Sequence, residues 1–120
     1  MNVINVAAKP TGRTAYRVVP SRDDPVIFQV DGVLTRVIEI SAQCALAPST
    51  ELKLGRRYPF NLDLPSSHIG ITGYVDVLPE LDNGDVVCLF VDLSAEELDQ
   101  IHRYVLMRQK QVIRHMRESA

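Results

Sequence analysis

The dipeptide Asp31-Gly32 constrains the fold of this 120-residue chain more than any other feature of its sequence. It separates Val26–Val30, whose β-branched and aromatic residues are typical of a strand, from a second run of similar character over Val33–Ser41. Glycine accepts the positive φ that a tight hairpin turn requires. The sequence therefore predicts two antiparallel strands joined by a two-residue turn.

The predicted return strand has two different faces, because successive side chains of a strand alternate. Leu34, Ile38 and Ile40 share the more apolar face, which we expect to turn toward the core. Glu39 and Ser41 project together from the other face. That face is either an ordinary polar strand surface or part of a binding site.

Further strands are predicted where apolar residues alternate or run together between turn residues. These segments are Cys44–Ala47, Tyr58–Leu64, Ile69–Leu78 and Val86–Leu93. The last of them is apolar almost throughout, which predicts a central strand buried on both faces. About six strands at this spacing predict a mainly β fold, a small antiparallel β-barrel, followed by one long C-terminal helix.

The predicted helix starts after Ser94, a good N-cap, and can run to about Glu118 because no proline or glycine interrupts it. Glu97 stands at the capping-box position, where its side chain can bond back to the cap residue. The first half of the helix carries an apolar stripe that we expect to pack on the sheet, namely Leu98, Ile101 and Val105.

The charges of this helix are sorted along its length, acidic near the start and basic from Arg103 onward, which suits the helix macrodipole. The far half repeats apolar residues at contact spacing: Val105, Leu106, Val112, Ile113 and Met116. Arg108 and His115 interrupt a regular heptad. The far half is therefore either a surface for homo-oligomerisation or a basic, solvated helix end.

Composition and charge exclude several functional classes. The formal charge of −2 gives no general attraction to DNA or RNA. Cys44 and Cys88 are too few and too far apart for a disulfide framework or a metal knuckle, which fits a reducing cytoplasm. No apolar run approaches the roughly 18 residues of a membrane span, and the first residues form no signal peptide. We expect a single cytoplasmic domain.

The sequence predicts no catalytic site and no metal site. His68, His102 and His115 are scattered over a loop and the helix without metal-ligand spacing. No serine or cysteine has a base at motif distance, and the glycines do not form a phosphate-binding loop. We therefore expect a binding domain without a resident cofactor, and not an enzyme.

Arg13 and Arg17 stand close together in a turn-prone segment just before the first predicted strand. If this segment makes one turn, the two guanidiniums come within about 6 Å, close enough to bind one small anion. Arginine suits a phosphate or a guanine edge, because its planar fork donates two parallel hydrogen bonds. A solvated basic arm is the alternative interpretation.

The order and spacing of these elements resemble the PilZ domain, a small bacterial β-barrel module whose ligand is the second messenger cyclic di-GMP. The family's RxxxR motif matches Arg13–Arg17, and its [D/N]xSxxG motif aligns with Glu39–Cys44. The Leu54-Gly55 turn, the long apolar last strand and the closing helix are also similar. The resemblance divides the chain into an N-terminal arm (1–12), a PilZ-like domain (13–104) and a C-terminal helix extension (105–120).

The resemblance also implies a ligand site. Arg13 and Arg17 would bind phosphates and guanine edges of cyclic di-GMP, with Glu39 and Ser41 as hydrogen-bonding partners. Glu39 stands where the family has Asp or Asn and reaches one methylene further. Cys44 stands where the family has Gly. If that glycine adopts positive φ or lets the ligand approach the backbone, a cysteine side chain weakens binding.

Two functions follow from the resemblance. In the first, the domain is a non-catalytic cyclic di-GMP receptor that changes its presented surface on binding and so signals to a protein partner. In the second, the degenerate second motif leaves a ligand-blind adaptor that works through protein contacts. The intact arginine pair favours the receptor, whereas Glu39 and Cys44 favour the adaptor.

Overall fold

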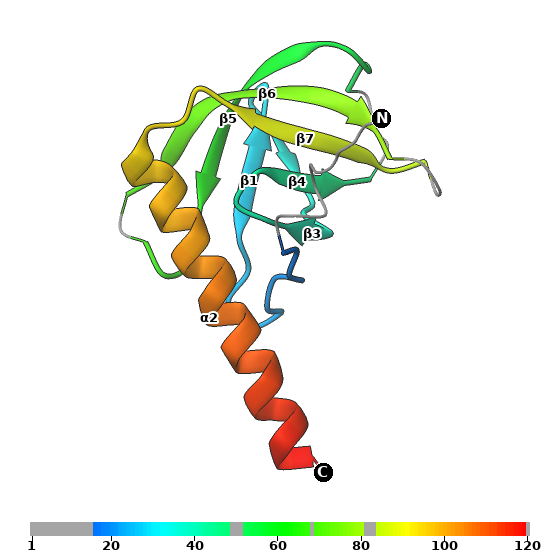
Figure 1. The fold of residues 1–120 in the computed structure, drawn as a ribbon. Helices are drawn as coiled ribbons and strands as arrows, with labels where there is room; N and C mark the ends of the chain where they lie inside the picture. Colours follow the sequence, from blue (N-terminus) through cyan, green and yellow to red (C-terminus); the bar gives the residue numbers. More distant parts are fainter. Residues whose placement is uncertain (1–15, 49–51, 68, 81–83, 120) are drawn as a thin grey trace, which may run out of the picture.

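In the part of the chain that the structure describes, seven antiparallel strands form one curled sheet, a half-barrel, beside one long helix (Figure 1). The computed structural model describes residues 16–48, 52–67, 69–80 and 84–119. The strand order is β2-β1-β5-β6-β7-β4-β3. The elements are β1 (Ile27–Val30), β2 (Val33–Thr35), β3 (Glu39–Ile40), β4 (Cys44–Ala47), β5 (Arg57–Asp63), β6 (Ile71–Pro79), β7 (Val86–Val91) and α2 (Ala95–Ser119). The mainly β, barrel-like prediction with a C-terminal helix is confirmed.

The predicted hairpin at Asp31-Gly32 is confirmed. Asp31 and Gly32 both have positive φ, 53° and 78°, and Val30 pairs with Val33 across the turn. Two successive residues with positive φ give the backbone twist that matches the twist of the flanking strands. The turn therefore joins β1 and β2 at one edge of the sheet.

The predicted return strand over 33–41 is wrong, because the chain divides there into two strands at opposite edges of the sheet. β2 ends at Thr35, and β3 pairs with β4 at the other edge. Between them, the amide of Ile38 already donates to the carbonyl of Leu46 in β4, at 2.8 Å. Leu34, expected in the core, is 70% exposed, whereas Ile40 is buried. Alternation alone does not show where a chain leaves one edge for the other.

One hydrophobic cluster joins one face of the curled sheet to the first half of α2. Its members are Val18, Phe28, Val30, Ile40, Ala45, Ala47, Phe60, Leu62, Leu64, Ile71, Val75, Val77, Val86, Cys88, Ile101, Tyr104 and Val105. β7 is central, as predicted, but only Val86 and Cys88 are fully buried, whereas the residues between and after them are half-buried. The expectation of burial on both faces is wrong because only one face of this strand meets the cluster.

The predicted capping box at the start of α2 is confirmed. The Ser94 amide donates to a Glu97 carboxylate oxygen at 3.0 Å, and the Glu97 amide donates to the Ser94 hydroxyl at 3.1 Å. Ile101, Tyr104 and Val105 pack against the sheet, whereas Leu98, expected in the stripe, is 40% exposed. Tyr104 therefore packs the helix against the sheet, whereas the predicted contact of Leu98 is largely missing.

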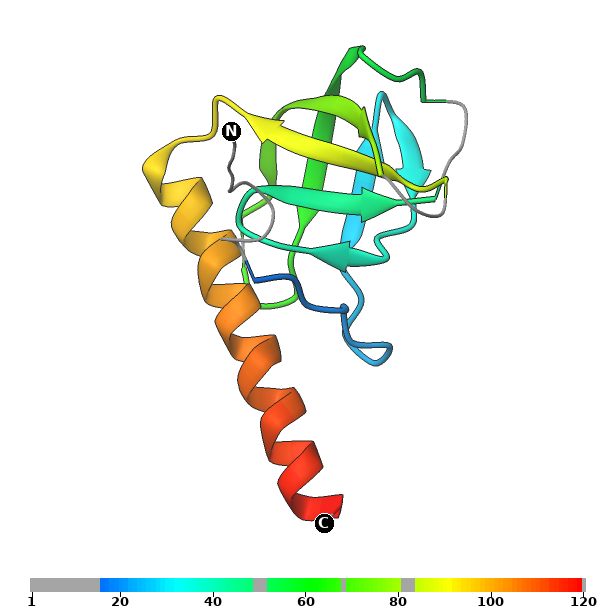
Figure 2. The ribbon, with the colours of Figure 1, turned by 45° about the vertical axis from the view of Figure 1, so that its right-hand side comes forward.

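The helix continues past the sheet in both ribbon views (Figures 1 and 2). Its last hydrogen bond to the rest of the described domain is donated by Arg108 Nε to the carbonyl of Val19, at 2.8 Å. From Lys110 to Glu118 every residue is exposed. Within the part of the chain that the structure describes, no helix has the length and apolar character needed to cross a membrane.

Candidate ligand site

The end of the first motif lies directly against the second motif. Val18 and Ile40 exchange two backbone hydrogen bonds, each 2.9 Å long, so the segment before β1 runs along the outer edge of β3. Both residues are buried. This bridge places Arg17 and Glu39, each one residue before a bridging residue, on the same part of the surface. Arg13 lies outside the described residues.

Arg17 is bracketed by two carboxylates. Its Nη1 donates to Glu80 Oε2 at 3.0 Å and lies 3.8 Å from Glu39 Oε1. The three side chains are only 27%, 25% and 36% exposed, respectively. Partial burial alone would lower the pKa of Arg17, but the hydrogen bond and the nearby negative charges outweigh it and raise that pKa. Arg17 therefore stays charged, and the two carboxylates hold it in place and largely balance its charge.

Glu80 was not identified from the sequence. It follows β6, and its amide donates to the carbonyl of Asp85, at 2.9 Å, in the connection to β7. The contact with Arg17 spans 63 positions along the chain. The sequence around Glu80 does not indicate that its partner is Arg17. The two residues meet only because the sheet curls.

Ser41 is fully buried and holds the turn between β3 and β4. Its hydroxyl oxygen accepts hydrogen bonds from the amides of Gln43, at 3.1 Å, and Cys44, at 3.2 Å. Its own amide donates to the Cys44 carbonyl at 2.9 Å. The hydroxyl thus organises the backbone of the second motif, and its direct contact with a ligand stays a prediction.

Cys44 belongs to β4, where it pairs with Leu89 and is 3% exposed. Among the described residues other than glycine, only Asp31 and Asp92 have positive φ. Cys44 therefore occupies ordinary strand backbone, and the strain expected if this position required glycine does not arise. Its thiol lies 3.6 Å from the Ser41 hydroxyl, inside the turn.

A hollow of about 310 Å³ opens beside this junction, between Tyr16 in the segment before β1, the β3–β4 turn and α2. Its lining residues are Tyr16, Ala42, Gln43, His102, Val105, Leu106 and Gln109. Tyr16 is 58% exposed, so part of its side chain is accessible at the rim. The sequence suggests for Tyr16 either stacking on a base or packing against the barrel. Ala42 and Gln43 are only spacers of the second motif, and the motifs give no indication of the helix residues.

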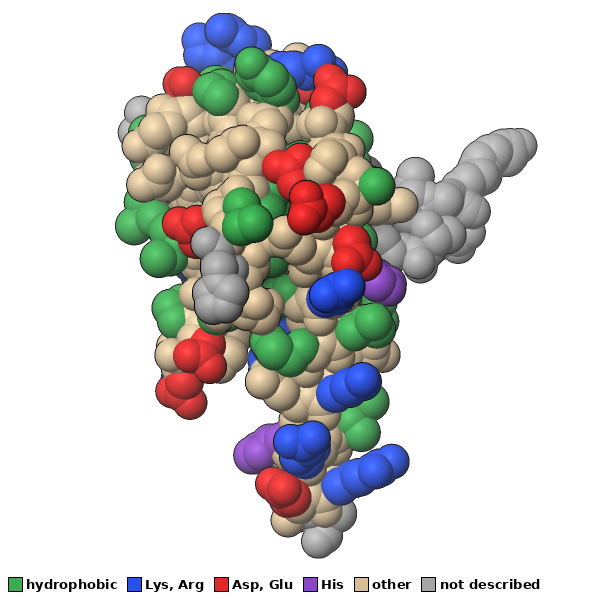
Figure 3. Space-filling view, turned by 90° about the vertical axis from the view of Figure 1, so that its left-hand side faces the viewer, with side chains coloured by type: hydrophobic (Ala, Val, Ile, Leu, Met, Phe, Trp, Pro, Cys, Tyr) green, Lys and Arg blue, Asp and Glu red, His purple; other side chains and the backbone are tan. Residues whose placement is uncertain are grey.

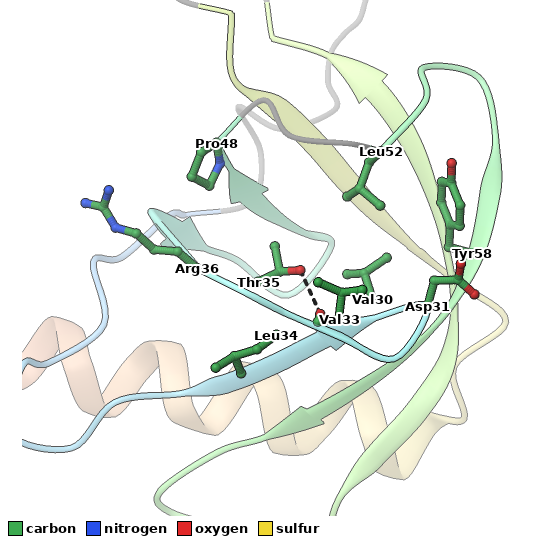
Figure 4. A pocket seen from close by; sticks show the side chains of 9 residues that line it. All are labelled: Val30, Asp31, Val33, Leu34, Thr35, Arg36, Pro48, Leu52 and Tyr58. Carbon is green, nitrogen blue, oxygen red and sulfur yellow. Dashed lines mark hydrogen bonds between the residues drawn. The ribbon is translucent and has the colours of Figure 1, made fainter.

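A second hollow, of about 320 Å³, lies at the β1–β2 hairpin (Figure 4). It is lined by Val30, Asp31, Val33, Leu34, Thr35, Arg36, Pro48, Leu52 and Tyr58. Asp31 and Arg36 lie at opposite ends of the row of lining side chains in Figure 4, so their charges do not converge on one point. None of the residues of the two motifs lines this hollow. It is therefore the weaker candidate for a charged ligand.

Among the described residues, no group of three or more His, Cys, Asp or Glu side chains could hold a metal ion. His102 and His115 are both exposed on α2. Cys44 and Cys88 are buried free cysteines on neighbouring strands. The chemistry that this part of the molecule offers is hydrogen bonding, stacking and ion pairing.

No family model matches the chain, and no curated protein matches its sequence. Two solved structures have a similar fold. The Bacillus subtilis inhibitor of motility, MotI/DgrA, is 15% identical with a TM-score of 0.64, over 85% of this chain and 53% of that one, so this chain corresponds to about half of it. The uncharacterised Legionella protein Lpg0364 is 12% identical with a TM-score of 0.54, over 87% of this chain and 96% of that one.

Proposed function

We propose that this chain is a non-catalytic effector domain that binds cyclic di-GMP at the junction of the segment before β1, the β3–β4 turn and α2. The observation that carries the proposal is the Val18–Ile40 bridge, because it brings the described end of the first PilZ-like motif against the second motif, beside a hollow. The likeness to MotI/DgrA, a PilZ-domain protein, supports a PilZ-like fold. The ligand rests on the motifs and on the geometry of the junction.

The hollow has the chemistry to hold a planar base. Tyr16 offers a ring for stacking, which contributes about 1–3 kcal/mol per base in single-stranded nucleic acid sites. Gln43 and Gln109 carry amides that can donate and accept hydrogen bonds to base edges. Since α2 supplies part of the lining, an occupied hollow would connect ligand binding to the helix.

Arg17 has donors to spare for a phosphate. Both carboxylate contacts involve Nη1, one of the three nitrogens of the guanidinium. The phosphate nevertheless has to compete with Glu39 and Glu80 for the cation. We therefore expect weak, salt-sensitive binding, in which Glu80 acts as an internal competitor of the ligand.

Isothermal titration of the whole chain with cyclic di-GMP tests the proposal. We expect binding that Arg17→Ala weakens by about tenfold or more, the loss of one charge-assisted hydrogen bond. Arg57→Ala is the matched control, because Arg57 is paired with Asp76 at 2.7 Å on an exposed part of the sheet. Equal affinity of both variants and the parent would refute a role for Arg17.

Removing the competitor gives a second readout. Glu80→Gln keeps the size of the side chain and removes its charge, so we expect it to raise the affinity for cyclic di-GMP by several-fold. Glu118→Gln, at the exposed end of α2, is the control and should leave affinity unchanged. An affinity that falls in Glu80→Gln would mean that Glu80 positions Arg17 for the ligand.

A ligand-blind adaptor is the second candidate, and one observation favours it: the described arginine of the first motif is already neutralised by two carboxylates. In this case neither the parent nor Glu80→Gln would release heat with the dinucleotide. That outcome would leave the domain with protein contacts as its function.

A further inference from the structure

The face of α2 that turns away from the sheet is sorted by charge. Acidic side chains lie over the first turns, and Lys and Arg side chains follow toward the C-terminus (Figure 3). With 3.6 residues per turn, these positions recur on one side of the helix. They are Glu96, Asp99, Arg103, Leu106, Lys110, Ile113, Arg114 and Arg117, and all of them are exposed. We call this set the outer face of α2.

The basic part of the outer face makes no ion pair within the described part of the chain: none includes Lys110, Arg114 or Arg117. Two large apolar side chains lie on the same face as these cations, Leu106 at 40% and Ile113 at 45% exposure. A helix end with no neighbour gains little stability from packing, so a partner on this face would stabilise it.

We propose that the outer face binds the same face of a second copy of this chain, with the two helices antiparallel. The register follows from the charges. If Asp99 lies opposite the second copy's Arg114, the midpoint of the overlap falls between Leu106 and Met107. The same register places Glu96 opposite the second copy's Arg117, because this pair has the same midpoint.

The twofold symmetry of this arrangement doubles each contact. Each acidic helix start meets the basic end of its partner, and the two Leu106 side chains meet near the symmetry axis. The one like-charge approach is Arg103 to the second copy's Lys110, and Arg103 is already paired with Asp99 at 2.8 Å. The antiparallel orientation also sets opposite ends of the helix macrodipoles side by side.

Other occupants fit this face less well. A parallel pair of helices would place acidic start against acidic start and basic end against basic end. An anionic lipid surface would attract the basic end but repel Glu96 and Asp99, and the outer face carries no aromatic side chain of the kind that anchors interfacial helices. Charge complementarity therefore selects a second copy.

The dimer should be weak and sensitive to salt, since exposed ion pairs contribute little individually and are screened by ions. Sedimentation equilibrium of the whole chain measures this directly. We expect self-association that weakens at least tenfold when the Debye length falls from about 30 Å to about 3 Å. A parent that is monomeric at every concentration and at low salt would overturn the proposal.

A charge swap identifies the surface. Arg114→Glu with Arg117→Glu makes both ends of the outer face acidic, and Glu96→Lys with Asp99→Lys makes both ends basic. Each double variant should be monomeric because like charges meet, whereas an equimolar mixture of the two should form a heterodimer. Helical content by circular dichroism verifies that both variants are folded.

The control variant carries Arg22→Glu and Arg36→Glu, two charge reversals at exposed positions outside α2. It should form the same dimer as the parent. Two outcomes contradict the proposal: dimers that persist in both outer-face variants, and variants that stay monomeric when mixed. If the parent is monomeric and cosediments with anionic phosphatidylserine vesicles, the outer face binds lipid and the dimer proposal is wrong.

Discussion

At the scale of single residues, Cys88 has an unusual environment for an ionisable group. Its side chain is fully buried in β7, and burial, reinforced by the neighbouring Cys44, raises the pKa of the Cys88 thiol to about 12 from an ordinary value of 9.0. A thiol that stays protonated is a poor nucleophile. Cys88 therefore acts as a small apolar core residue.

This environment predicts a loss of stability in alkali. The folded-state pKa is raised, so the contribution of Cys88 is fully present below about pH 9 and is lost as pH rises toward about 12. Urea unfolding should show a free energy that falls by about 1 kcal/mol between pH 8 and pH 10 from this group. Cys88→Ala should have a shallower pH slope, and identical slopes would contradict the assignment.

Tyr104 is the largest fully buried side chain, and among the described residues its hydroxyl makes no hydrogen bond of ordinary geometry, only a weak interaction with the Ser21 backbone. A buried polar group without a partner costs about 1–3 kcal/mol. We expect Tyr104→Phe to raise the free energy of unfolding by about 1 kcal/mol in urea titrations. Tyr74→Phe, at a 50% exposed position, is the control. A less stable Tyr104→Phe would show that the hydroxyl is satisfied.

At the scale of elements, the start of α2 depends on the reciprocal bonds between Ser94 and Glu97. We expect Ser94→Ala to lower the free energy of unfolding by about 1 kcal/mol, because it removes an acceptor from the first turn. Thermal or urea unfolding measures this loss. Ser66→Ala, in an exposed loop, should be neutral, and an equal loss in both variants would exclude a capping effect.

Local signals predicted the elements whose geometry is set by neighbouring residues. The Asp31-Gly32 turn and the Ser94 cap each depend on backbone conformation within a few positions, so the sequence alone locates them. The division of 33–41 into β2 and β3 depends on which edge of the sheet each part reaches. That choice is made by pairing with β1 and β4, which the local pattern does not contain.

At the scale of the whole molecule, the domain and the far half of α2 should be separable. Because residues 110–118 are exposed, removing 110–120 should change the free energy of unfolding by no more than about 0.5 kcal/mol. Removal of 101–120 deletes Ile101, Tyr104 and Val105 from the core and should prevent folding. Urea unfolding of both truncations checks this, and a large loss in the shorter deletion would contradict it.

The sequence by itself determined the Asp31-Gly32 hairpin turn, the helix with its cap, and the RxxxR and ExSxxC segments, because these depend on residues close together in the chain. Tertiary structure alone decided that Glu80 meets Arg17 and that α2 lines a hollow beside Tyr16. The physical reason is distance along the chain. Such contacts form only when the sheet curls, and no local preference of the backbone encodes them.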